Sequence, residues 1–348
     1  MNLNLYGHDS RWLMIDCGLT FNAPLNPEDD YAEQVKRHEL VAADPRFIEE
    51  RKDLLCGIII THAHEDHLGA IPFLWQRFRQ PIYTTKFTAE VLRRKLSEFE
   101  FGHLVEIIEM TPLDECIIGP FSVKWLPITH SLPEPCGLVI TTPVGKVFHT
   151  GDWKLDSNPV VGEGVNYDYF KHLATQDIDA MVCDSTNALK HGNSVSESAC
   201  EAGLYHYINS APKRVVVACF ASNIARLITI ARVAQQTQRR MAVFGRSLVN
   251  MIGIARRTGY WPEDCQLIDR RHVGYLPEEE VLIVATGSQG EPKAALNQLA
   301  KDTHRDISLT SQDTIIFSTI VIPGNEQPIE QLVKLFTQRQ IQVVQAHD

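Results

Sequence analysis

The sequence predicts an α/β protein with two parts that differ in their succession of strands and helices. Residues 1 to about 185 hold many short strand-like runs between turn residues, which favours a sandwich with helices on its faces. From about residue 190 onward, strand-like and helix-like runs alternate, which favours a parallel sheet with crossover helices. We therefore expect one domain at residues 1–188 and a second at 189–348.

In the first part, apolar runs predict strands within residues 11–19, 54–61, 81–85, 104–110, 121–129, 136–142, 145–152 and 179–186. Two helix-like stretches lie at residues 69–78 and 88–99, and Thr88 is a suitable N-cap for the second because an i, i+3, i+4 apolar pattern follows it.

In the second part, four strand-like runs at residues 214–220, 241–245, 280–286 and 313–321 are each followed by a helical pattern. The helical patterns cover residues 222–236, 247–259, 292–301 and 328–339, and one more strand is expected from residue 341.

The composition is that of a globular protein, with 44% hydrophobic and 22% charged residues among 348. No apolar run approaches the roughly 18 residues of a membrane helix, and the first residues lack the features of a signal peptide. The eight cysteines form no C-x-x-C pair, so a zinc ribbon is not expected. We expect a cytoplasmic protein with no membrane partner. The net charge of −10 argues against a surface that is basic throughout.

The segment "THAHEDHLGAIP", residues 61–72, concentrates metal-binding side chains directly after an apolar strand. Along an extended chain, His62, His64 and Asp66 point roughly one way, whereas His67 breaks the alternation. One short loop would then offer two histidines to one cation, and an acid with a histidine to another. Imidazole and carboxylate suit zinc and similar divalent metals.

Two later strand ends offer further ligands. His130 follows one strand, and Asp152 follows another after Gly151, so the Asp152 carboxylate could bridge two metals. Asp16 also ends a strand and could orient the loop. Isolated histidines such as His103 and His149 are expected to be structural. Two divalent ions about 3.5–4 Å apart would activate water for attack on a phosphoryl or a carbonyl centre, and the spacing leaves both open.

This loop resembles the H-x-H-x-D-H motif of the metallo-β-lactamase superfamily, which implies an αβ/βα sandwich. By that resemblance His62, His64 and His130 would hold one zinc. Asp66 and His67 would hold a second zinc, Asp152 would bridge the two, and Asp66 would be a catalytic carboxylate.

Four later segments resemble the β-CASP domain of the ribonuclease J family, a domain that is inserted in that sandwich. They are residues 183–188, 219–227, 285–292 and 322–326. This second resemblance implies a ribonuclease that cuts RNA internally and also degrades it from 5′ to 3′, holds RNA between its two domains, and is a homo-oligomer at full length.

The β-CASP segments add candidate substrate residues. Asp184 and Ser185 end a strand, and the resemblance suggests that Asp184 aids a proton donor at the leaving group, although it is equally typical of a turn. Ser222 is expected to cap a helix whose first amides, with Asn223, could hold a phosphate, and simple helix capping is the alternative.

The chain departs from the family at both ends. The family's first strand with its "GGxxEIGxN"-like turn, and its later H-x-S-G-H motif, are both expected to lie outside it. The second metal would then lack one ligand, and His347 is not assigned to that role. We therefore expect a fragment, weakly active or inactive. The alternatives are a small-molecule metallo-hydrolase of the same fold and a non-catalytic RNA-binding subunit.

Overall fold

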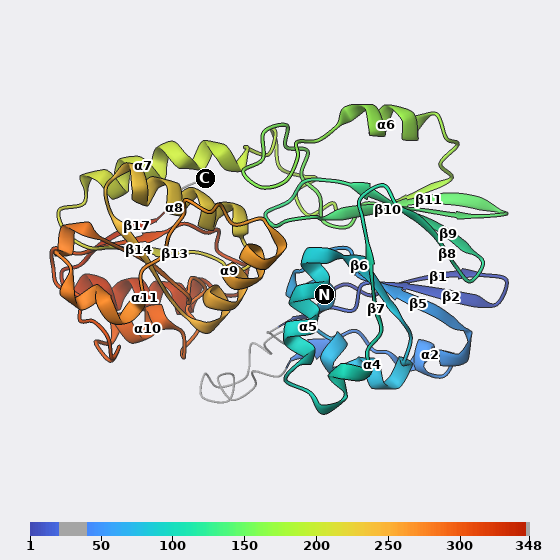
Figure 1. Cartoon of the computed structure of the whole chain (residues 1–348), viewed down its shortest axis with the longest axis horizontal. Helices are drawn as coiled ribbons and strands as arrows, with labels where there is room; N and C mark the ends of the chain where they lie inside the picture. The colour runs from blue at the N-terminus through green and yellow to red at the C-terminus, as the bar shows by residue number, and fades with distance from the viewer. Residues whose placement is uncertain (21–39, 346–348) are drawn as a thin grey trace. The chain divides into compact units, whose positions relative to one another are not determined.

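Residues 1–20 and 40–345 are described by the computed structural model, in which the chain divides into two units (Figure 1). Residues 1–157 and 163–194 form the first unit, and the second comprises residues 158–162 and the chain from residue 195 onward. His347 lies outside the described residues.

The first unit contains two five-stranded sheets. In the first sheet β1 (Asn4–His8) is antiparallel to β2 (Arg11–Ile15), and the remaining strands run parallel, in the order β1-β2-β5-β6-β7. These remaining strands are β5 (Leu55–Ile59), β6 (Ile82–Thr85) and β7 (Ile107–Met110).

The second sheet has the order β12-β11-β10-β9-β8, and only β11 and β12 are parallel neighbours. Its strands are β8 (Glu115–Ile118), β9 (Phe121–Pro127), β10 (Cys136–Thr142), β11 (Gly145–His149) and β12 (Ala180–Val182). A small ribbon joins β3 (Leu19–Thr20) to β4 (Val41–Ala42).

The core of the first unit lies between its two sheets. Leu13 and Ile59 of the first sheet belong to one buried cluster with Val123, Trp125 and Leu138 of the second. Alternate side chains of β9 point inward, as expected of a strand with one face in a core. This arrangement confirms the predicted sandwich.

Helices cover the outer faces of the sandwich. Helix α5 (Lys86–Leu96) contacts β6 and β7 of the first sheet, and Leu173 of α6 (Tyr167–Ala174) joins a buried cluster with Val139 and Phe148 of the second. The other helical segments are α2 (Arg46–Glu49), α3 (Glu65–Leu68), α4 (Ile71–Phe78), η1 (Lys52–Leu54) and η2 (Glu100–Leu104).

The second unit is built on a five-stranded, wholly parallel sheet in the order β14-β15-β13-β16-β17. The strands are β13 (Val215–Ala218), β14 (Arg240–Phe244), β15 (Val281–Ala285), β16 (Thr314–Phe317) and β17 (Gln342–Gln345). The predicted parallel sheet with crossover helices is confirmed.

Helices flank this sheet. Helices α10 (Ala295–Ala300) and α11 (Glu326–Gln338) pack into one cluster with β13–β16, and α7 (Cys200–Ser210) packs on α8 (Ile224–Gln236). Helix α9 (Arg246–Thr258) follows β14, and the short helices are η3 (Glu197–Ala199), η4 (Arg270–Tyr275) and η5 (Glu278–Glu280).

The predicted start of the helix at residues 88–99 is wrong. Helix α5 begins at Lys86 with Thr85 as N-cap, not at Thr88, because the chain enters the helix directly from the end of β6. Thr88 is instead a fully buried residue of the first turns. Helices α6 and α7, and strands β1 and β8, were not predicted.

Among the described residues, none of the helices is both long and apolar enough to span a membrane.

Candidate metal centre

The histidine-rich loop follows β5, as the sequence predicts, and leads into α3. His64 is extended and serves as the N-cap of α3, so the strand-like alternation ends there. Asp66 and His67 therefore follow the helix and not the strand. This change of direction is why Asp66 lies with His67, and not with His62 and His64 as strict alternation predicts.

Three histidine rings converge in the first group of candidate ligands. The distance between His62 Nε2 and His64 Nδ1 is 3.0 Å, and that between His130 Nε2 and His64 Nδ1 is 3.1 Å. With Asp152, these residues offer four ligand atoms within 4.8 Å of one another. Three imidazole nitrogens and one carboxylate oxygen are a donor set that suits a tetrahedral zinc ion.

The second group consists of Asp66, His67 and Asp152, again with ligand atoms within 4.8 Å. His67 Nε2 lies 3.2 Å from Asp152 Oδ1 and 3.5 Å from Asp66 Oδ2. Asp152 thus belongs to both groups, in the position that a bridging ligand requires.

Burial keeps the first three histidines neutral. It lowers the pKa of His64 to about 4 and that of His130 to about 3, and it holds the pKa of His62 well below its usual range. Neutral rings have a lone pair free for a cation, which is the form that a metal ligand needs.

The surroundings of His67 are strongly negative. Burial of its ring opposes the charged form, but Asp16, Asp152 and Asp66 together raise its pKa well above the usual value. The pKa of Asp66 is lowered despite partial burial, because His67 and His64 favour its ionised form. A field that favours a proton here also favours a divalent cation, so the donors fit a metal in both groups.

Asp16 supports the centre through buried contacts with Thr61 and His67. Its carboxylate is buried and accepts hydrogen bonds from the backbone N–H and the hydroxyl of Thr61, and it lies 2.7 Å from Nδ1 of His67. Its own backbone has a φ of +63°, which is uncommon outside glycine. The three partners hold Asp16 in this conformation and orient the Nε2 atom of His67 toward the other ligands.

Two residues of the centre were not singled out in the sequence. The backbone N–H of Asn2 donates to the Asp66 carbonyl at 2.7 Å, and its side-chain Nδ2 lies 3.0 Å from His67 Nε2. Gly18 passes so close to the loop that a Cβ there would lie 1.7 Å from the Asp66 carbonyl oxygen. Only the glycine two residues after Asp16 could have signalled the second of these contacts.

Asp184 and Ser185 follow β12 in the same unit. The backbone N–H of Asp184 donates to the hydroxyl of Thr150, which lies two residues before Asp152. The Asp184 carboxylate accepts hydrogen bonds from the N–H and the hydroxyl of Thr186, so it also closes a local turn. Ser185 is exposed and donates to the Cys183 carbonyl.

Ser222 and Asn223 belong to the second unit. The N-cap of α8 is Asn223 and not Ser222, because the Asn223 side chain accepts a hydrogen bond from the Arg226 N–H at 2.8 Å. Ser222 contributes its backbone carbonyl, which accepts from the Ile224 N–H.

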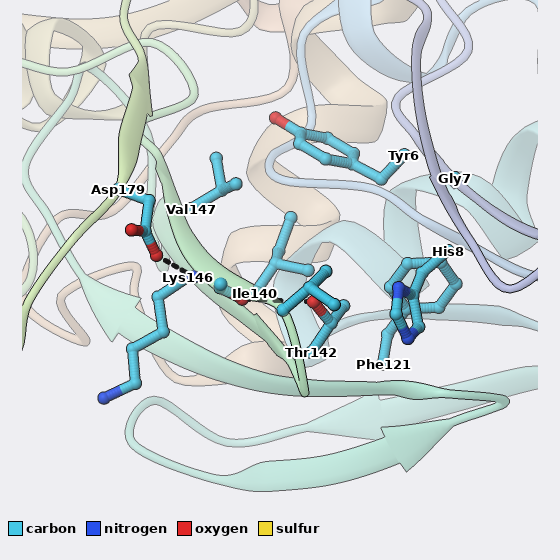
Figure 2. A pocket seen from close by; sticks show the side chains of 11 residues that line it. Tyr6, Gly7, His8, Phe121, Ile140, Thr142, Lys146, Val147 and Asp179 are labelled. Atoms are coloured by element: carbon cyan, nitrogen blue, oxygen red, sulfur yellow. Dashed lines mark hydrogen bonds between the residues drawn. The ribbon is translucent and has the colours of Figure 1, made fainter.

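A separate hollow is lined by residues of β1, β9, β10 and β11 (Figure 2). It has a volume of about 270 Å³ and is lined by Tyr6 and His8 of β1, and by Gly145 and Lys146 at the start of β11. Asp152 follows the other end of β11, so this hollow is not the candidate metal centre. The predicted structural role of His149 is consistent with its hydrogen bond to the Tyr6 hydroxyl at 2.8 Å.

Comparisons with known proteins match both units. The Metallo-beta-lactamase superfamily matches residues 2–182, and the family described as Ribonuclease J, beta-CASP domain, matches residues 212–336. The chain is 37% identical to Ribonuclease J of Sinorhizobium meliloti over 348 residues, which are 99% of this chain and 60% of the relative. It is 38% identical to Ribonuclease J of Mycolicibacterium smegmatis over 330 residues, 94% of this chain and 57% of the relative.

The chain therefore spans about 60% of the length of these relatives. A solved structure, described as a protein of unknown function from Enterococcus faecalis, superposes with a TM-score of 0.64 at 18% identity, covering 99% of this chain and 84% of the other. At that identity the likeness shows the fold alone.

Proposed function

This chain belongs to the metallo-β-lactamase superfamily and carries the β-CASP domain of ribonuclease J, and from that membership we propose that it is a metal-dependent ribonuclease. The observation that carries the proposal is the convergence of two donor groups that share Asp152. Scattered surface acids would not place three neutral imidazoles against one carboxylate.

In this proposal His62, His64, His130 and Asp152 hold one divalent metal, and Asp66, His67 and Asp152 hold the other. Zinc is the expected ion because the donors are nitrogen-rich. Two such ions would supply Lewis-acid activation of a water and of the phosphate group.

The side chains have distinct tasks around that chemistry. Asp66 is ionised and its side chain is 44% exposed, so it can accept a hydrogen bond from a water and orient it. Asp184 is proposed to aid protonation of the leaving oxygen, which is supported by the hydrogen bond that its backbone N–H donates to the hydroxyl of Thr150, two residues before Asp152. For that role its carboxylate must release Thr186 when RNA binds.

Three residues, Ser185, Ser222 and Asn223, are the candidates for holding the RNA. Ser185 is exposed beside Asp184, and Asn223 leads into the 13-residue helix α8. We propose that Ser185, Ser222 and Asn223 contact phosphates, with the first amides of α8 adding favourable partial charge. Affinity should then fall with salt, because phosphate contacts release counterions.

The test is cleavage of labelled 5′-monophosphorylated RNA by a full-length version of the protein and by its variants. His64→Ala and Asp152→Ala are expected to abolish cleavage while largely retaining RNA binding, and a chelator should do the same. His103→Ala and Asp168→Ala are matched controls, because both side chains are exposed and lie outside the two donor groups. Full cleavage by His64→Ala would refute the proposal.

The direction of cutting needs separate substrates. A circular RNA is cut only by an endonuclease, whereas release of single nucleotides from a 5′-labelled linear RNA reports 5′-to-3′ degradation. We propose both activities, in RNA decay in the cytoplasm, and a homo-oligomer in the full-length form. Chelator-insensitive RNA binding with no cleavage of either substrate would instead identify a binding subunit.

A further inference from the structure

Resting on the proposed metal centre, we infer that helix α5 positions both ligand-bearing loops, one from each end of the helix. Glu134 joins the His130 loop to the start of α5, and Glu65 joins the histidine-rich loop to its last turn. Neither glutamate belongs to the two donor groups, so each would act through the ligands beside it.

At the start of α5, the Glu134 carboxylate accepts a hydrogen bond from the Phe87 N–H at 2.7 Å. The side chain of Thr85, the N-cap residue, makes no capping hydrogen bond, so the Glu134 carboxylate caps the helix in its place. The Thr85 hydroxyl in turn donates to the Glu134 carbonyl at 3.2 Å. A carboxylate at this end is also favoured by the helix dipole.

The backbone of Glu134 has a φ of +55°, in the left-handed region. A residue other than glycine stays there only where its surroundings hold it, and here both its side chain and its carbonyl are bound to the start of α5. Glu134 follows His130 by four residues, so this contact sets the course of the loop that presents the His130 ring.

At the other end, Lys95 Nζ lies 2.5 Å from Glu65 Oε1. Glu65 is the first residue of α3 and sits between His64 and Asp66, one from each donor group. Lys95 lies in the last turn of α5, where a cation also suits the helix dipole. The ion pair therefore restrains the turn between His64 of the first donor group and Asp66 of the second.

Helix α5 is itself firmly held. Phe87, Ala89 and Leu92 are fully buried against the sheet. Strand β6, which leads into the helix, is tied to β5 beside the histidine-rich loop, because the Thr84 hydroxyl donates to the Ile60 carbonyl at 2.8 Å. A rigid helix that is bonded to both loops fixes the distance between His130 and His64 before any metal binds. This lowers the free-energy cost of ordering the metal ligands.

The first test measures zinc affinity by competition with a chromophoric chelator, and the electronic spectrum of bound Co²⁺, in the whole chain. Glu134→Ala should weaken binding about tenfold and change the Co²⁺ spectrum. Glu134→Gln keeps an acceptor oxygen for the Phe87 N–H and should stay close to the unmodified chain. Glu98→Ala is the matched control, because it removes only an exposed ion pair with Arg94 at the end of the same helix.

The second test asks whether Glu65 acts through Lys95. Glu65→Ala and Lys95→Ala should weaken zinc binding by similar factors, and the double variant should be no weaker than either single one. Additive losses would overturn the role of this ion pair. If Glu134→Ala does not fold, Thr85→Val replaces it, because that change removes the donor to the Glu134 carbonyl.

The outcomes separate the two proposals. If the unmodified chain binds no divalent metal, the proposed function fails and the positioning role fails with it. If the chain binds zinc but Glu134→Ala binds it as tightly and with the same Co²⁺ spectrum, only the role of α5 is refuted.

Discussion

Single residues set the electrostatics of the metal centre, and Asp16 is the one most deeply placed. It is fully buried and meets three donors from Thr61 and His67. We predict that Asp16→Asn weakens binding of the second metal about 10- to 100-fold, because an amide offers one acceptor oxygen and no charge. A zinc titration followed by calorimetry measures this. Asp53→Asn, at an exposed position, is the control, and equal second-site affinity in both variants would contradict the prediction.

The candidate ligands were within reach of sequence reasoning because imidazole and carboxylate groups at strand ends are local signals. His62, His64 and Asp152 needed only the order of strands and loops. Asn2 could not be found in this way, because its contact with Asp66 spans 64 residues and uses a backbone N–H that any residue but proline has. Asp66 lies with His67, as expected of an acid and a histidine offered to one cation, whereas strict alternation alone would have grouped it with His62 and His64.

At the scale of elements, the cap of α8 distinguishes two neighbouring residues. Asn223→Ala should lower the free energy of unfolding by about 1 kcal/mol, because it removes the side-chain acceptor for the Arg226 N–H. Ser222→Ala should change it little, since Ser222 contributes a backbone carbonyl that alanine keeps. Urea unfolding followed by circular dichroism compares the two. A larger loss of unfolding free energy in Ser222→Ala would show that Ser222 is the cap, as the sequence predicted.

Elements were predictable where burial was strong. The inner strands of the second unit are continuous apolar runs, as expected of a parallel sheet covered on both faces. Helix α7 was not predicted because it buries only Leu204 and Ile208 and carries exposed Tyr205 and Tyr207. Helix α6 buries Leu173 alone, so its pattern is too weak to separate from a loop.

For the whole molecule, metal binding should raise the free energy of unfolding. A ligand that binds only the folded chain adds about 2.7 kcal/mol at 100 times its dissociation constant. We predict that zinc raises the melting temperature in a concentration-dependent way and that a chelator reverses the rise. His64→Ala should abolish most of the shift, whereas His103→Ala should keep it. Scanning calorimetry measures the transitions, and an equal shift in both variants would place the zinc elsewhere.

In the proposed two-metal centre, the shared Asp152 carboxylate couples the two donor groups. One carboxylate would serve both ions only with a change in its own charge distribution, so we expect that loading of either group alters the affinity of the other. By thermodynamic linkage the factor is the same in both directions. The zinc-binding isotherm of this chain is therefore expected to depart from two independent sites, and replacement of Asp152 should remove the interaction between the two ions together with the ligand.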